Sequence, residues 1–167
     1  MNGIVEWITN IFGSCNPNII IFVISLLPIL ELRGGMIAAT LLGVPYVTAI
    51  IVCIIGTIIP IPFILLFINK IFNWLKRFKT AGRFVNWIET KTLKKRKQLD
   101  KWGFWGLILF VGIPIPGTGA WTGSLLATLL RIPVKRSAVA IGIGVLLSAA
   151  IMSVITYLIP YLVASAG

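Results

Sequence analysis

The sequence predicts an all-α integral membrane protein with two inverted repeats, each a re-entrant helical hairpin followed by a transmembrane helix. Three observations lead to this fold class. The 167-residue chain is 58% hydrophobic and 11% charged, which is too apolar for a soluble domain of this size. Its apolar stretches are broken at two places by proline and glycine, and the chain resembles itself when it is shifted by 88 residues. We expect a single membrane domain covering residues 1–167.

The first 14 residues contain Glu6 but no Lys or Arg. A secretory signal begins with a basic segment, so we expect no cleavable targeting peptide. Ile4, Ile8 and Ile11 recur at helical spacing, which predicts a short helix at the membrane interface over residues 1–14.

The first repeat is expected over residues 19–68. Its first apolar part is interrupted by Pro28 and by the charged run from Glu31 to Gly35. Its second part, residues 46–68, has no charge and is long enough to cross the membrane, because about 20 helical residues span the hydrocarbon core.

Residues 69–101 are expected to form a basic amphipathic helix on the cytoplasmic membrane surface. Apolar side chains recur there at three- and four-residue intervals, with basic residues between them. The basic residues are Lys70, Lys76, Arg77, Lys79, Arg83, Lys91, Lys94, Lys95, Arg96, Lys97 and Lys101. Because spans are attached at both ends, anionic lipid head groups are the expected partner, and no nucleic acid is expected.

The second repeat is expected over residues 103–160 and follows the same plan. Its apolar stretch 103–130 is broken by the run from Pro114 to Gly119, and an uncharged stretch, 137–159, should cross the membrane. The shift of 88 residues aligns prolines, glycines and a four-residue segment of the two repeats. The matched positions are Pro28 with Pro116, Gly35 with Gly123, Ala39–Leu42 with Ala127–Leu130, Pro45 with Pro133, and Gly56 with Gly144.

The basic residues indicate how the broken stretches meet the membrane. If all four apolar stretches crossed it, segments 69–101 and 131–136 would lie on opposite faces, although Lys and Arg beside spans stay in the cytoplasm. If the broken stretches enter and return, both segments are cytoplasmic and the repeats are inverted. The hairpin tips, 28–35 and 114–123, would then meet near the midplane, where inverted-repeat transporters hold their substrates.

Glu31 and Arg33 are the charged residues inside the apolar stretches, and we expect them to line a substrate site. A charge at the centre of a span costs about 2.5–3.5 kcal/mol, so such residues face the protein or a cavity. Arg33 stays charged, and because the chain has no His, Glu31 is the expected proton carrier of a proton-linked process. Alternatively, the two charges neutralise each other and only hold the turn. The other expected substrate-site residues supply exposed backbone, hydroxyl donors or an aromatic ring. They are Gly34, Gly35, Pro116, Gly117, Thr118, Gly119, Trp121 and Thr122.

Two runs resemble the signature motifs of a known family. Glu31 to Gly35 and Pro114 to Gly123 are similar to the motifs of the putative small multidrug export protein family, a compact relative of the DedA/VTT membrane proteins. The resemblance implies two re-entrant hairpins with adjoining spans in the bacterial plasma membrane. Through the DedA relatives it also implies translocation of phosphate-bearing lipids such as undecaprenyl phosphate.

We therefore expect a secondary transporter or flippase for an anionic, lipid-like substrate, linked to protons through Glu31. One alternative is a proton-driven exporter of lipophilic cations with Glu31 as counter-charge, which Arg33 disfavours. Another is a membrane organiser without transport, whose basic helix recruits lipid or a partner. With no His and one buried carboxylate, neither an enzyme nor a metal or cofactor site is expected. The broad apolar surface predicts a homodimer.

Overall fold

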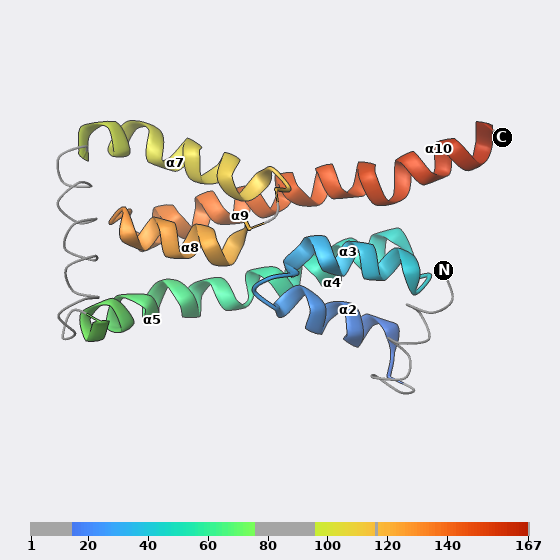
Figure 1. The fold of residues 1–167 in the computed structure, drawn as a ribbon, viewed down its shortest axis with the longest axis horizontal. Helices are drawn as coiled ribbons and strands as arrows, with labels where there is room; N and C mark the ends of the chain where they lie inside the picture. Colours follow the sequence, from blue (N-terminus) through green and yellow to red (C-terminus); the bar gives the residue numbers. More distant parts are fainter. Residues whose placement is uncertain (1–14, 76–95, 116, 167) are drawn as a thin grey trace. The chain divides into compact units, whose positions relative to one another are not determined.

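A computed structural model describes residues 15–75, 96–115 and 117–166, leaving out the side chains of 68–75, 96–102, 164 and 166. The expected interfacial helix 1–14, residues 76–95 of the expected linker and Pro116 lie outside this description. Within the described residues the chain forms helices and no strands (Figure 1). The all-α prediction is therefore confirmed for this part of the chain.

The chain divides into two compact units that do not coincide with the two repeats. Unit 1 consists of residues 1–57 and 148–167, and unit 2 of residues 58–147. Both boundaries fall inside long apolar helices, so each unit contains the hairpin of one repeat and the later part of the other repeat's long helix.

Unit 1 is built on a helical hairpin of α2 (Pro17–Leu26) and α3 (Glu31–Leu41), which pack against each other. At the start of α2 the side chain of Asn16 accepts a hydrogen bond from the Asn18 amide at 2.9 Å, and Pro17 occupies the first helical turn, both common at helix N-termini. The unit also contains α4 (Tyr46–Ile58), the end of α9 (Val134–Ser153), the π-helix η1 (Val154–Leu158) and α10 (Ile159–Ala166).

The hairpin of unit 1 ends part-way along α4. The Thr57 hydroxyl donates a hydrogen bond to the carbonyl of Ser25, close to the hairpin turn, at 3.3 Å. Thr57 follows Tyr46, the first residue of α4, by three helical turns, which is about 16 Å along the axis. The other end of the hairpin lies beside the start of α4, where residues 16–18 and 42–45 line a small pocket.

Unit 2 repeats this arrangement with α7 (Arg96–Gly112), α8 (Ala120–Leu129) and the first part of α9 (Val134–Ser153). Helices α7 and α8 form a hairpin, and α5 (Pro60–Leu75) packs against α8. Gly112, at the end of α7, lies against Leu147, about 20 Å along α9 from its first residue. Helices α5 and α8 end, and α7 and α9 begin, at one end of the unit (Figure 1).

The connections α3–α4 and α8–α9 have the same backbone hydrogen bonds, at residues that the shift of 88 pairs with each other. Each helix ends with a residue in the left-handed conformation, Gly43 with φ +66° and Arg131 with φ +53°. This is the usual way to satisfy the last carbonyls of a helix. The equivalent bonds are Gly43 N to Thr40 O (3.3 Å) with Arg131 N to Thr128 O (3.0 Å), and Val44 N to Ala39 O with Ile132 N to Ala127 O (both 2.9 Å).

Close packing at glycine is also repeated. The Cα of Gly35 faces Ile21 and Cys53, and that of Gly123 faces Leu107 and Ile141. Cys53 and Ile141 match at the shift of 88 residues, but Ile21 and Leu107 match at 86. The turn of the second hairpin is therefore two residues longer than that of the first, a difference that a single sequence shift does not reveal.

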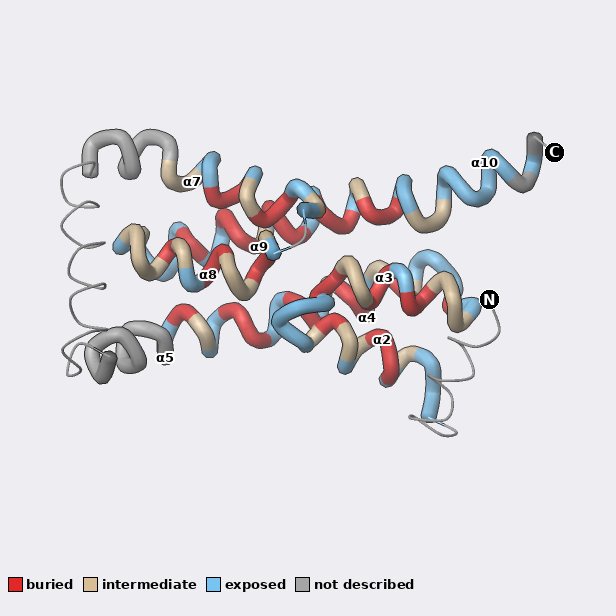
Figure 2. The backbone as a smooth tube through the Cα atoms, viewed as in Figure 1, coloured by how far each residue is buried: buried red, intermediate tan, exposed pale blue. Residues whose placement is uncertain are grey.

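In the part of the chain that the structure describes, two helices are long and apolar enough to cross a membrane. They run from Tyr46 to Phe67, 22 residues, and from Val134 to Val163, 30 residues. The second helix begins three residues before the predicted span and continues through Pro160. The π-helix η1, which directly precedes Ile159 and Pro160, changes the pattern of backbone hydrogen bonds, and this is one way in which a helix accommodates proline. Along both helices buried positions alternate with exposed ones (Figure 2), and the exposed ones include large apolar residues such as Ile51, Phe63, Val139 and Leu146. Lipid is the solvent that such a surface fits.

Candidate functional site

The turn of the first hairpin, residues 27–33, is called the Glu31 turn. Residues 27–30 are exposed, and α3 begins at Glu31, whose amide donates to the carbonyl of Leu27 at 3.0 Å. An acidic residue in the first turn of a helix interacts favourably with the helix dipole. The turn therefore brings a carboxylate to the start of α3.

Glu31 has two unusual properties for a charged residue. It is 6% exposed, and its φ of +47° lies in the left-handed region that non-glycine residues seldom adopt. Its negative charge acts on the guanidinium of Arg33, which is only partly buried. Glu31 and Arg33 thus place opposite charges in the first turn of α3, and whether they bind a substrate or only hold the turn stays a prediction from the sequence.

Gly34 and Gly35 serve helix packing. The Gly34 amide donates to the carbonyl of Leu30 at 2.8 Å, within the helix. Gly35 is buried, and a methyl group on it would meet the Ser25 hydroxyl, the sulfur of Cys53 at 2.7 Å and the carbonyl oxygen of Ile21 at 3.3 Å. The expectation of exposed backbone at Gly35 is wrong, because three chain segments converge on this Cα.

A buried polar group beside Gly35 was not predicted from the sequence. The Ser25 hydroxyl donates to the carbonyl of Ile21 at 2.7 Å and interacts with the Cys53 thiol, while Thr57 bonds the Ser25 carbonyl. Hydroxyls in apolar helices commonly bond to the carbonyl four residues earlier, so their presence alone gives no signal of a cluster. Only the packing of α2, α3 and α4 brings these residues together.

The turn of the second hairpin, residues 113–119, is called the Gly117 turn. Its described residues include two glycines with positive φ, Gly117 at +85° and Gly119 at +153°. The Thr118 amide donates to Ile115 O at 3.1 Å, and the Thr118 hydroxyl lies 2.9 Å from the same oxygen and 3.1 Å from Ile113 O. Thr118 thus bonds to its own turn.

The remaining predicted residues of the second hairpin lie in the first turn of α8. Trp121 and Thr122 are partly buried, and the Thr122 hydroxyl is 3.4 Å from the carbonyl of Gly119. Trp121 is the repeat equivalent of Arg33, and Gly119 is the equivalent of Glu31. At these two positions the second repeat therefore has no charge, and its turn has a different backbone conformation, with φ of +153° at Gly119 against +47° at Glu31.

The Glu31 turn belongs to unit 1 and the Gly117 turn to unit 2. Within unit 1 the structure brings Glu31, Arg33, Gly34 and Gly35 together, and within unit 2 it brings Gly117, Thr118, Gly119, Trp121 and Thr122 together. A substrate site shared by both turns stays a prediction from the sequence.

A cavity of about 570 Å³ in unit 1 was not predicted from the sequence. Its lining is mainly apolar and contains Tyr46, Tyr157 and Tyr161. The Tyr157 hydroxyl donates to the carbonyl of Val44 at 3.1 Å, and its ring meets Tyr46 edge to face at 5.1 Å between centroids. These contacts fix η1 against the start of α4.

Comparison with known proteins gives one family. The family model described as "Putative small multi-drug export protein" matches residues 31–151, from the first residue of α3 into α9. No curated protein and no solved structure matches the chain.

Proposed function

Because the chain belongs to the putative small multi-drug export protein family, we propose that it is a membrane transporter whose substrate binds at the Glu31 turn. The observation that carries this proposal is a buried Glu31 with positive φ, whose charge acts on Arg33. A left-handed non-glycine residue costs about 1–2 kcal/mol, and a charge inside the membrane costs more. A turn with only a structural role would be more stable with uncharged residues, such as those of the second repeat.

The charges of the turn favour an anionic substrate taken up together with a proton. Glu31 and Arg33 are neutral as a pair. An anion that binds Arg33 while Glu31 is ionised leaves a net negative charge in the membrane, which is unfavourable. Protonation of Glu31 removes this charge and leaves the guanidinium to the anion. A phosphate or carboxylate on a lipid-like molecule suits this chemistry, as the resemblance to the DedA/VTT proteins also implies.

The proposed depth of the site is the middle of the membrane. The hairpin turn lies about 16 Å along α4, and a hydrocarbon core of about 30 Å places that level near the midplane if α4 begins at the surface. The hairpins are then re-entrant. The basic residues at the starts of α7 and α9, together with Arg131 after α8, support a cytoplasmic location for that end of unit 2, and the two repeats are inverted in this proposal.

The test is transport in proteoliposomes with an imposed pH difference. The probe is phosphatidylglycerol with a fluorescent label placed away from the head group. Its arrival in the other leaflet is followed by quenching of the label's fluorescence. We expect Arg33→Ala to lose lipid transport, and Glu31→Gln to lose its dependence on the pH difference. Wild-type transport in both variants would overturn the proposal.

The chain offers a matched control. Glu89 and Lys91 are also an acid and a base two positions apart, outside the apolar stretches. The variants Glu89→Gln and Lys91→Ala should transport normally. The double variant Glu31→Gly with Arg33→Trp, which copies the second repeat, should insert and fold but not transport; normal transport in it would show that the pair is only structural.

A second candidate is a proton-driven exporter of lipophilic cations, with Glu31 as counter-charge. The family description and the tyrosine-lined cavity favour it, because aromatic faces attract cations. Efflux of ethidium that is lost in Glu31→Gln but kept in Arg33→Ala would support this candidate over the first.

The remaining expectations are part of the same proposal. We propose a non-enzymatic protein of the bacterial plasma membrane that forms a homodimer, since exposed apolar residues cover the long helices. Cross-linking in membranes that yields only monomer would contradict the dimer. If neither lipid nor cation moves, the protein is better explained as a membrane organiser.

A further inference from the structure

All three tyrosines of the chain line one cavity of unit 1. Tyr46 is the first residue of α4, whereas Tyr157 and Tyr161 belong to η1 and α10, at the other end of the chain. The cavity has a volume of about 570 Å³ and a mainly apolar lining. Sites for small molecules measure roughly 300–1,000 Å³ and are apolar with a few polar groups. The fold therefore gathers every tyrosine of the chain around a space of the size of a small-molecule site.

One face of the helical run α9–η1–α10 forms the longer wall of this cavity. The residues of the wall recur at intervals of three and one, which is the spacing of a single helix face. The π-helix contributes part of the wall, and π-helical turns are frequent at functional sites. The wall residues are Ala150, Ser153, Val154, Tyr157, Leu158 and Tyr161.

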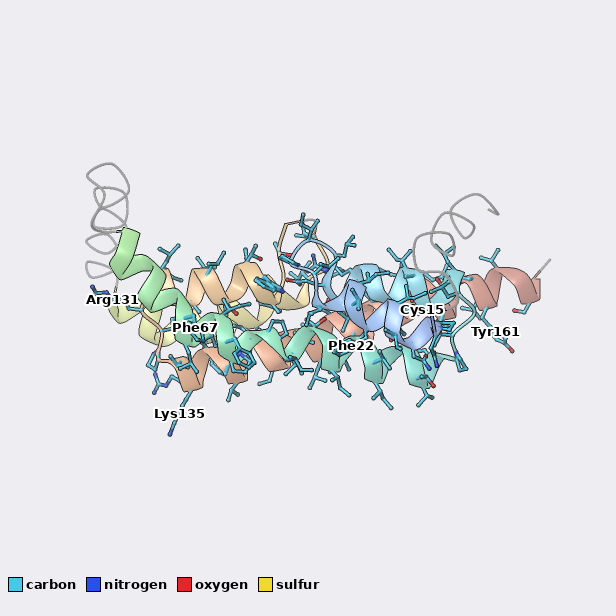
Figure 3. All side chains as sticks on the ribbon, turned by 90° about the horizontal axis from the view of Figure 1, so that it is seen from below. Cys15, Phe22, Phe67, Arg131, Lys135 and Tyr161 are labelled. Carbon is cyan, nitrogen blue, oxygen red and sulfur yellow. The ribbon has the colours of Figure 1, made fainter. Side chains whose placement is uncertain are left out.

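Two of the three tyrosine rings are open to a ligand. Tyr157 serves the fold, because its hydroxyl donates to the Val44 carbonyl at 3.1 Å and its ring meets the ring of Tyr46 at an interplanar angle of 68°. Tyr46 is 45% exposed and Tyr161 is 71% exposed. Figure 3 shows the Tyr161 side chain extending outward from α10. A ligand in the cavity can thus contact the rings of Tyr46 and Tyr161 beside a ring that is held in place.

The lining of the cavity favours a cation over an anion. None of the described residues that line it is charged, so an anion would lose its hydration without meeting a positive partner. A cation is attracted to the faces of aromatic rings, which several tyrosines together can surround. The apolar wall suits hydrophobic substituents on such an ion. A neutral apolar molecule would gain as much from leucine as from tyrosine.

We propose that this cavity binds a lipophilic organic cation, such as an ammonium or phosphonium ion with aromatic or alkyl groups. The proposal deepens the second candidate function and rests on it for the substrate class. It places the binding of the cation at the start of α4, whereas the hairpin turn with Glu31 lies beside the end of α4. Binding in the cavity does not require transport.

The test is equilibrium dialysis of the full-length protein in uncharged detergent micelles against tetraphenylphosphonium, with protein-free micelles subtracted. Tetraphenylborate is the matched probe, because it has nearly the same shape and the opposite charge. Tyr161→Leu should weaken tetraphenylphosphonium binding about fivefold through loss of one contact between cation and ring, and should change tetraphenylborate binding less than about twofold. Tyr161→Phe keeps the ring and should bind as the wild type does.

A second variant and a control make the outcome decisive. Tyr46→Leu should have the same effect as Tyr161→Leu, but it also removes the ring contact with Tyr157, so Tyr161→Leu carries the test if Tyr46→Leu does not fold. Phe63→Leu removes an aromatic ring of α5 that is 61% exposed and lies outside the cavity lining, and it should bind as the wild type does.

Three results would overturn the proposal. Unchanged tetraphenylphosphonium binding in Tyr161→Leu would leave the tyrosines as anchors at the membrane surface. Equal losses for the two probes would show an apolar cavity without preference for a cation, and an equal loss in Phe63→Leu would show general binding to exposed rings. Ethidium efflux is a separate measurement: binding that depends on Tyr161 without efflux supports this site and contradicts only the second candidate function.

Discussion

Replacing Gly35 by alanine tests the packing that positions the Glu31 turn. A methyl group on Gly35 would meet the Ser25 hydroxyl, the Cys53 sulfur at 2.7 Å and the Ile21 carbonyl oxygen at 3.3 Å. The carbonyl belongs to the backbone of α2 and cannot rotate away, and the Ser25 hydroxyl already bonds to it. Helix α3 must therefore shift away from α2 or α4.

The expected free-energy change follows from two opposing effects. Adding a methyl group to a well-packed core costs about 1–3 kcal/mol, whereas alanine is favoured over glycine in a helix by about 0.5–1 kcal/mol. We expect Gly35→Ala to lower the free energy of unfolding by about 1–2 kcal/mol. Gly142→Ala is the matched control, because a Cβ on Gly142 has no neighbour within 4 Å; it should be neutral or stabilising.

The measurement is unfolding by SDS titration in mixed micelles, followed by far-UV circular dichroism. A double-mutant cycle adds Ser25→Ala, which removes the nearest contact, so Gly35→Ala should then cost less by at least about 0.5 kcal/mol. Equal stability of Gly35→Ala and Gly142→Ala would refute the reasoning, and an unchanged cost in the Ser25→Ala background would show that Ser25 is not the contact that matters.

The other predictions concern the α3–α4 connection of unit 1. Tyr157→Phe should lower the free energy of unfolding by about 0.5–1.5 kcal/mol through loss of the hydrogen bond to Val44, whereas Tyr161→Phe should change nothing measurable in the same titration. Gly43→Ala should cost about 1–2 kcal/mol although no atom lies near the new methyl group, because φ is +66°. If Gly43→Asn, which tolerates this conformation better, is as unstable as Gly43→Ala, the conformational explanation fails.

The helical class and the plan of each repeat follow from the sequence. Long apolar stretches can form only helices in lipid, and Pro28 and the run 114–119 interrupt them where the structure has its turns. The shift of 88 residues identified equivalent residues correctly from α3 to α4 and from α8 to α9, because the repeated glycines and prolines have fixed backbone roles there. Charge among apolar residues pointed to Glu31 and Arg33.

The tertiary structure decided what these residues contact. It showed that Gly35 packs against α2 and α4, that the Thr118 hydroxyl bonds within its own turn, and that the second hairpin has the longer turn. These outcomes depend on which helices meet and at what separation, and hydropathy and spacing report only which face of a helix is apolar. The positive φ of Glu31 and Arg131 is likewise a property of the folded chain. The sequence determined that these two positions carry charged residues. Only the structure showed that their backbone adopts a conformation that favours glycine and is strained for other residues.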